Sequence, residues 1–206
     1  MGTVYHRCME LLDFATPQPP EALVQQVLGE LELEGSTDAG AAAEELAGML
    51  ETFRGHPLAA ELAAAEEVYR ELDFVFECGP AELRGQIDLL YRTADGRWRI
   101  VDWKSDCVGE EGTAPHAERY ALQMRVYADA AEGFLAAEPH SVDATLYFLR
   151  TGQTHTFDAA TPAPPHDPAE LAARLVAARR SGRYRRHEGK QCRYCEHRRL
   201  CDGGGQ

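Results

Sequence analysis

The chain has 206 residues, of which 44% are hydrophobic and 27% charged, and its formal net charge is −13. A chain of this size and composition can bury one sizeable core, which excludes global disorder and two full-sized domains. No stretch approaches roughly 18 consecutive apolar residues, and the N-terminus carries charges where a secretion signal needs an apolar run. We therefore expect a soluble, cytoplasmic protein that does not associate with membranes.

Helical and extended patterns alternate along the first half of the chain. Helical periodicity predicts helices at 3–14, 21–34, 40–53 and from about residue 57. Extended patterns predict strands at 68–76, 83–91 and 98–104. A strong turn sequence at 93–96 joins the last two strands as an antiparallel hairpin.

The second half of the chain continues with one long helix and two shorter strands. The helix is expected at about 117–136, the strands at 142–149 and 155–157, and a further helix at 168–180. This order predicts an α/β (α+β) fold with a mixed central sheet flanked by helices. A Pro-rich connector at 161–168 divides the chain into a core at 1–160, with a helical insertion at about 20–66, and a C-terminal Cys-rich segment at 161–206.

Charge is distributed unevenly between these parts. Residues 174–199 carry ten basic and two acidic side chains, a balance of +8, whereas residues 1–173 carry 11 basic and 31 acidic ones, a balance of −20. Such a basic segment indicates contact with a polyanion, although a tail that merely offsets an acidic body is the alternative. The candidate contact residues are Arg179, Arg180, Arg183, Arg185 and Arg186.

Acidic and basic side chains come together on the predicted hairpin. Asp102 and Lys104 are two residues apart on one strand, so their side chains point to the same face. Asp88 lies on the paired strand and can reach the same end of that face. Paired carboxylates of this kind suit Mg²⁺ or Mn²⁺, and a nearby lysine can stabilise developing charge during phosphodiester hydrolysis. An ordinary cross-strand ion pair between Asp88 and Lys104 is the alternative.

Five ordered motifs surround these residues. They are GTVYHRCMELLDF at 2–14, YRELDF at 69–74, GQID at 85–88, DWKS at 102–105 and QMRVY at 123–127. Together they resemble the RecB-type branch of the PD-(D/E)XK nucleases, and most closely the C-terminal nuclease domain of AddA- and RecB-like helicase–nucleases, over about residues 2–157. The resemblance implies a restriction-endonuclease-like core and a metal-dependent, exonuclease-type deoxyribonuclease. It further implies DNA end processing in recombinational repair, on single-stranded or unwound ends, beside a superfamily 1 helicase.

The resemblance also implies a metal site for Mg²⁺ or Mn²⁺. Its ligands would be His6, Asp88, Asp102 and the backbone carbonyl of Trp103.

Four further residues take catalytic roles by the same resemblance. Lys104 would be the catalytic lysine, and Glu71 an acidic partner near the metal, although the glutamates at 66–67 could fill that role. Gln123 and Tyr127 are spaced i, i+4, so on a helix they share one face and can reach the site or the DNA together.

Three cysteines near the C-terminus form a second motif. Cys192, Cys195 and Cys201 are spaced as ligands of a 4Fe-4S cluster or of zinc, with free thiols as the alternative. They resemble the C-terminal part of the iron–sulfur latch of some RecB-type nucleases. That latch takes its fourth cysteine from upstream of the motif histidine, where this sequence has only five residues. We expect Cys8 as the substitute, with Cys78 and Cys107 as alternatives, or His187 or His197 if the metal is zinc.

Two other functions fit the same motifs. One is a RecB-like nuclease of the type that acts in CRISPR adaptation, which has the same chemistry in another pathway. The other is a catalytically inactive nuclease-fold module that binds DNA or a helicase. The sequence contains no P-loop, so any ATP-driven unwinding would come from a helicase subunit or domain outside this sequence.

Overall fold

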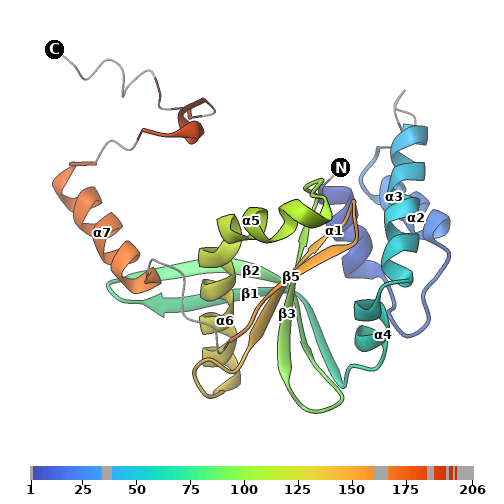
Figure 1. Cartoon of the computed structure of the whole chain (residues 1–206), viewed down its shortest axis with the longest axis horizontal. Helices are drawn as coiled ribbons and strands as arrows, with labels where there is room; N and C mark the ends of the chain where they lie inside the picture. Colours follow the sequence, from blue (N-terminus) through green and yellow to red (C-terminus); the bar gives the residue numbers. More distant parts are fainter. Residues whose placement is uncertain are drawn as a thin grey trace.

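A five-stranded mixed sheet with helices on both faces forms the body of the protein (Figure 1). The structure is a computed structural model, and it describes residues 2–33, 39–159, 167–184, 188–193, 195–196 and 198. The strands are β1 (Glu67–Cys78), β2 (Ala81–Arg92), β3 (Trp98–Lys104), β4 (Asp143–Phe148) and β5 (Gln153–Phe157).

The helices form three groups. The first contains α1 (Gly2–Leu11), α2 (Pro20–Glu30), α3 (Ala39–Arg54) and α4 (Pro57–Ala63). The second contains the 3-10 turn η1 (Glu110–Gly112), α5 (Thr113–Ala117), the 3-10 turn η2 (Glu118–Tyr120) and α6 (Ala121–Leu135). The C-terminal group contains α7 (Pro168–Ser181) and η3 (Lys190–Arg193). No helix in the described ranges is both long enough and apolar enough to cross a bilayer.

The sheet confirms the expected mixed α/β class. Its strand order follows the chain, with β1, β2 and β3 antiparallel, β4 parallel to β3, and β5 antiparallel to β4. The α5–α6 segment makes the crossover that parallel pairing of β3 and β4 requires. The single helix expected at 117–136 differs at its start: η2 occupies 118–120, and regular α-helix begins at Ala121.

Alternating side chains of the central strands fill the two faces of the sheet. Leu89 of β2 and Val101 and Trp103 of β3 pack against the α1–α4 layer. Ile100 of β3 packs on the other face, together with Met124 of α6. Because the side-chain period of a strand is two, Asp102 and Lys104 share the α6 face with Ile100.

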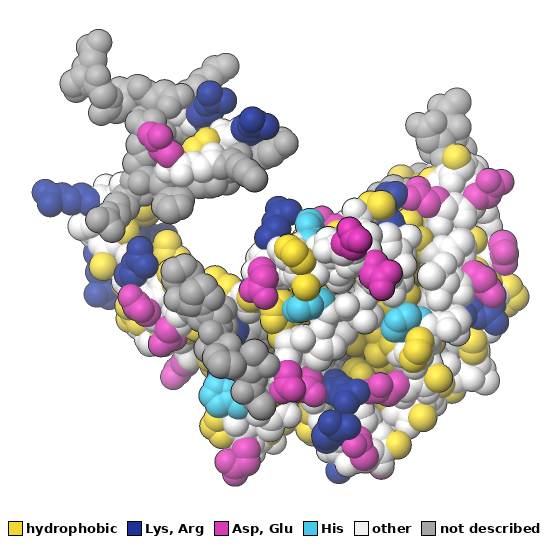
Figure 2. Space-filling model, in the orientation of Figure 1, with side chains coloured by type: hydrophobic (Ala, Val, Ile, Leu, Met, Phe, Trp, Pro, Cys, Tyr) yellow, Lys and Arg dark blue, Asp and Glu magenta, His cyan; other side chains and the backbone are white. Residues whose placement is uncertain are grey.

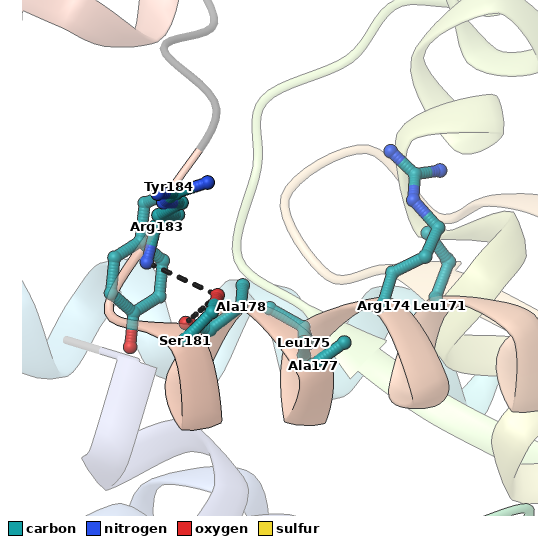
Figure 3. A pocket seen from close by; sticks show the side chains of 8 residues that line it. All are labelled: Leu171, Arg174, Leu175, Ala177, Ala178, Ser181, Arg183 and Tyr184. Atoms are coloured by element: carbon teal, nitrogen blue, oxygen red, sulfur yellow. Dashed lines mark hydrogen bonds between the residues drawn. The ribbon is translucent and has the colours of Figure 1, made fainter.

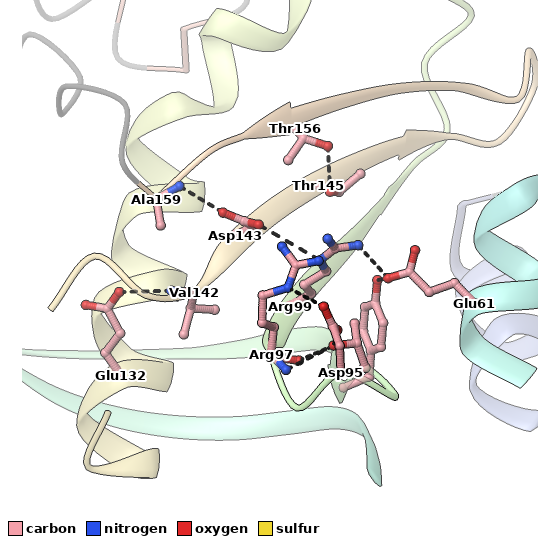
Figure 4. Close-up of polar contacts among 12 residues, drawn as sticks. Glu61, Asp95, Arg97, Arg99, Glu132, Val142, Asp143, Thr145, Thr156 and Ala159 are labelled. Carbon is pink, nitrogen blue, oxygen red and sulfur yellow. Dashed lines mark hydrogen bonds and ion pairs between the residues drawn. The ribbon is translucent and has the colours of Figure 1, made fainter. Parts of the chain in front are cut away.

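A polar network ties α4 to the central strands (Figure 4). Tyr91 of β2 donates a hydrogen bond to Glu61 Oε1 at 2.8 Å, and Arg99 of β3 donates to the same oxygen at 2.6 Å. Arg99 also lies 3.9 Å from Asp143 of β4. The network therefore joins one helix to three strands.

The N-terminal end of α7 meets the tip of the β1–β2 hairpin. Gly79 has a φ of +58°, and a Cβ atom there would lie 3.2 Å from the carbonyl oxygen of Ala169. Glycine is therefore required both by the turn and by the close approach of α7.

Candidate active site

The two aspartates lie where β3 separates from β2. The β2–β3 ladder ends at the pair of Leu89 and Val101. Asp88, directly before Leu89, and Asp102, directly after Val101, therefore lie at the point of separation. There the Asp88 carboxylate accepts a hydrogen bond from the backbone N–H of Trp103 at 2.8 Å. The bond fixes Asp88 against the end of β3 and brings both carboxylates to one end of the sheet.

His6, Glu71 and Asp88 form a compact group of ligand atoms. One ligand atom from each lies within 4.8 Å of the other two, and His6 Nδ1 is 3.6 Å from Asp88 Oδ2. The three residues come from α1, β1 and β2, so the group exists only after the first helix packs beside the hairpin. One imidazole nitrogen and two carboxylates are a ligand set that suits a divalent cation.

Glu71 adopts an unusual backbone conformation for a strand residue. Its φ is 48°, and it alone among the described non-glycine residues of positive φ lies within a strand. The β1–β2 ladder pairs Arg70 with Leu89 and Leu72 with Ile87, which leaves Glu71 unpaired opposite Asp88. A non-glycine residue with a left-handed backbone conformation is strained, and such strain concentrates at functional sites.

The alternative acidic residues lie elsewhere. Glu66 and Glu67 are each 3.4 Å from Arg92, at the end of the β1–β2 ladder that is farther from the hairpin turn. Their carboxylates are therefore committed to a surface ion pair, and Glu71 is the acidic side chain of β1 that joins His6 and Asp88.

Asp102 lies beside this group and contacts the α6 side chains. Lys104 Nζ is 2.7 Å from Asp102 Oδ2 and donates a hydrogen bond to Gln123 Oε1 at 3.2 Å. Gln123 Nε2 donates both to Asp102 Oδ1, at 3.0 Å, and to the hydroxyl of Tyr127, at 2.8 Å. One amide thus orients the acid, the amine and the phenol. Lys104 pairs with Asp102 and not with Asp88, unlike the alternative considered from the sequence.

The glycine of the GQID motif has a packing reason. A Cβ atom at Gly85 would lie 2.6 Å from the ring of Phe74, its partner across the ladder. The Phe74 ring in turn packs edge-on against Tyr127, with 5.7 Å between centroids. Gly85 therefore makes room for the ring that supports Tyr127.

Burial raises the pKa values of the three carboxylates of the site, although each of the two aspartates has a polar partner. Burial and then the nearby Asp88 carboxylate raise the pKa of Asp102 to about 6, although Lys104 lowers it. Burial also raises the pKa of Asp88, and burial and then Asp88 raise the pKa of Glu71. Asp102 Oδ2, although close to Lys104, accepts no hydrogen bond of acceptable geometry from the described residues. A divalent cation fits this donor set, because it would offset the negative charge of carboxylates that lie close together.

Two residues complete the surroundings of the site. The Trp103 side chain is buried on the opposite face against Phe53 and Tyr147, so only its backbone belongs to the site; the role of its carbonyl stays a prediction. Tyr120 was not singled out from the sequence, yet its ring centroid lies 4.3 Å from Lys104 Nζ. Its position three residues before Gln123 was the signal, since i, i+3 residues are neighbours on a helix.

The cysteines are only partly described. Cys8 is fully buried in the apolar cluster of the α1–α4 layer, where burial raises the pKa of its thiol to about 12, and neither feature favours a ligand role. Cys192 lies in η3 and Cys195 is exposed, whereas Cys201 lies outside the described residues. The cluster or zinc site stays a prediction.

The basic side chains gather at the C-terminal end, while acidic ones are prominent over α3 (Figure 2). Arg179, Arg180 and Arg183 are exposed at the end of α7, and the candidates at 185–186 lie outside the described residues. A groove of about 750 Å³ runs along α7 (Figure 3). It is lined by Leu171, Arg174, Leu175, Ala177, Ala178, Ser181, Arg183 and Tyr184.

A comparison with protein-family models identifies the family of this chain. A family model described as the PD-(D/E)XK nuclease superfamily matches residues 1–202. A solved structure titled "Crystal structure of SSO0001" covers 99% of this chain and 85% of its own, at 15% identity and a TM-score of 0.44. That similarity is too low to support an argument.

Curated relatives include ATP-dependent helicase/nuclease subunits of Staphylococcus aureus. Those of strains JH9 and USA300 are each 28% identical to this chain over 170 residues. The matches cover 74% of this chain but 14% of each relative, so the chain spans about a seventh of the length of these proteins.

Proposed function

The chain belongs to the PD-(D/E)XK nuclease superfamily, and from this membership we propose that it is a deoxyribonuclease that hydrolyses phosphodiester bonds with a divalent cation. The observation that carries the proposal is the convergence of two groups at one end of the sheet. His6, Glu71 and Asp88 offer ligand atoms within 4.8 Å, and the Asp102–Lys104 pair lies beside them.

The metal-binding part would consist of His6, Asp88, Asp102 and the backbone carbonyl of Trp103, with Glu71 as the acidic partner. Mg²⁺ or Mn²⁺ would supply charge stabilisation at the phosphate and a more acidic bound water. The Trp103 N–H holds the Asp88 carboxylate in place, and Gln123 holds Asp102.

Lys104 would act on the reacting phosphate or on the attacking water. Its ammonium lies in a partly enclosed site, with a side-chain exposure of 16%. A cation positioned where negative charge develops lowers the barrier, because its favourable orientation is set before the reaction. Gln123 and Tyr127 would keep that orientation and could also contact the DNA backbone.

The α7 region would hold the DNA strand. Exposed arginines contact phosphates without regard to base sequence, and the ring of Tyr184, which is 68% exposed, is available to stack on a base. This arrangement suits a single strand or an unwound end, as the basic segment of the sequence also suggests.

We also propose a biological setting: exonucleolytic DNA end processing and recombinational repair in the cytoplasm, next to a helicase chain or domain. The description of the relatives as helicase/nuclease subunits supports the helicase as neighbour. Because the chain spans only 14% of those proteins, this partnership needs its own test. A helicase chain added with ATP should increase the cleavage of blunt duplex DNA.

The activity itself can be tested on labelled DNA. Fluorescent single-stranded DNA should be cleaved with Mg²⁺ or Mn²⁺ and stay intact in EDTA. Asp88→Asn should abolish cleavage and weaken Mn²⁺ binding measured by calorimetry. Asp95→Asn, in an exposed turn where the carboxylate bonds to Thr93 and Arg97, is the matched control and should behave like the wild type. Equal cleavage with and without EDTA would reject the proposal, and so would DNA binding without any cleavage.

A further inference from the structure

Lys104 is held by an aromatic ring as well as by polar groups. Its ammonium lies 2.7 Å from Asp102 Oδ2, 3.2 Å from Gln123 Oε1 and 4.3 Å from the ring centroid of Tyr120. Lysine has a long, flexible side chain, so a contact on a third side reduces the positions that the ammonium can take. The negative face of an aromatic ring attracts a cation at this distance.

The ring of Tyr120 is itself anchored. Its hydroxyl donates a hydrogen bond to Asp106 Oδ2 at 2.8 Å, in the loop that leaves β3 two residues after Lys104. The other oxygen of Asp106 lies 3.2 Å from His116 Nε2, and the His116 ring packs edge-on against Phe148 of β4. The loop and α5 therefore fix the ring at its hydroxyl end.

Tyr120 also lies directly before α6, the helix that carries Gln123, another partner of Lys104. It ends η2, directly before α6, and Gln123 follows three residues later on the same face. Burial and then the hydrogen bond to Asp106 raise the pKa of Tyr120 to about 12, so the phenol stays a neutral donor at ordinary pH. One short segment thus presents both a ring and an amide to the ammonium.

We propose that Tyr120 is a positioning residue for Lys104, and that Asp106 and His116 hold its ring in place. The inference rests on the proposed function, because it assigns Tyr120 an effect on turnover through the catalytic lysine. Loss of the ring would let the ammonium sample positions that do not serve the reaction. Loss of the hydroxyl alone would leave the ring in contact with the ammonium.

The sequence provides a direct probe of this contact. The chain has two lysines, Lys104 and Lys190, so protein grown with ¹³C-labelled lysine gives side-chain signals from these two residues only. A ring below the ammonium should shift the Lys104 Cε methylene proton signals upfield through its ring current. The upfield shift should be kept in Tyr120→Phe and lost in Tyr120→Leu. This measurement needs neither metal nor DNA.

Kinetics test the effect on catalysis. Tyr120→Leu should lower kcat about tenfold, the equivalent of one cation–π contact, with KM for single-stranded DNA nearly unchanged. Tyr120→Phe should keep kcat within about threefold of the wild type, since it retains the ring. In a Lys104→Ala background, Tyr120→Leu should cause no further loss, because residues that act through one another are not additive. Tyr69→Leu, which removes a half-exposed tyrosine of β1 bonded to Glu67, is the matched control and should keep full kcat.

Each outcome separates the inference from the proposed function. An unshifted Lys104 signal in the wild type would overturn the contact, and a Tyr120→Leu variant with normal kcat would overturn its role in turnover. The same loss of kcat with and without Lys104 would show that Tyr120 acts independently of the lysine. If the wild type did not cleave DNA with Mg²⁺, the proposed function and the effect on turnover would fail together, while the signal shift would still report the contact.

Discussion

The strained backbone at Glu71 leads to a specific prediction about the balance between stability and activity. Glu71 has a φ of 48° inside β1, and its carboxylate faces Asp88 and His6. Replacing it by glycine removes the strain and the carboxylate together, whereas replacing it by alanine removes only the carboxylate. The two variants therefore separate the contribution of the backbone from that of the charge.

The magnitude follows from the conformation. A non-glycine residue in the left-handed region costs about 1–2 kcal/mol, and the extra freedom of glycine in the unfolded chain takes back about 0.5–1 kcal/mol. The free energy of unfolding of Glu71→Gly should therefore be about 0.5–1 kcal/mol higher than that of Glu71→Ala. For a chain of this length, that difference raises the melting temperature by roughly 1–4 °C.

The assay combines unfolding in urea with metal-dependent cleavage of labelled DNA. Both variants should lose activity about 10- to 100-fold, because the metal group loses one of its three close members. Equal stability of the two variants would refute the claim that β1 stores strain at this residue. Full activity in both would show that the Glu71 carboxylate is not part of the site.

Three further substitutions test other parts of the structure. Lys104→Ala should lower kcat at least about 100-fold while DNA affinity, measured by fluorescence anisotropy, stays within about twofold; unchanged turnover would make the lysine structural. His56 accepts a hydrogen bond from the N–H of Leu58 at the start of α4. Burial lowers the pKa of His56 below the ordinary 6.5, so as pH falls the imidazole is protonated in the unfolded chain before it is protonated in the folded one. The free energy of unfolding should thus fall as pH drops below about 6.5, by less than about 1 kcal/mol because solvent screens the ring. His56→Asn, whose side chain can also cap the helix, should lose this part of the pH dependence. Identical pH profiles of stability in the variant and the wild type would contradict the reasoning. Glu61→Ala removes the acceptor of the buried Tyr91 hydroxyl and should lower the unfolding free energy by about 1–3 kcal/mol in urea titrations. The loss should be smaller in a Tyr91→Phe background, and equal losses in both backgrounds would refute the coupling.

Much of the fold could be predicted from local patterns. Alternation of apolar residues located β3 at its observed bounds, and the turn at 93–96 predicted the β2–β3 hairpin. The helix expected at 168–180 is also present as α7, and Asp167 accepts a hydrogen bond from the N–H of Ala169 directly ahead of it. Helix ends were less accurate, since the 3-10 turn at 118–120 satisfies the same periodicity as a regular helix.

Within the site, spacing alone placed some of the residues. Asp102 and Lys104 had to share a face because they are two apart on a strand, and Gln123 and Tyr127 because they are four apart on a helix. These relations hold for any strand and any helix, so no tertiary contact was needed to infer them.

The remaining relations depend on how elements pack. The separation of β3 from β2 at Asp88, the approach of α1 that brings His6 within 3.6 Å of it, and the left-handed backbone of Glu71 have no counterpart in the sequence pattern. The same is true of the ring of Tyr120 beside Lys104. Sequence spacing specifies which face of an element a side chain occupies, but the register of strands and the docking of helices decide which faces meet, because those depend on contacts between residues far apart in the chain.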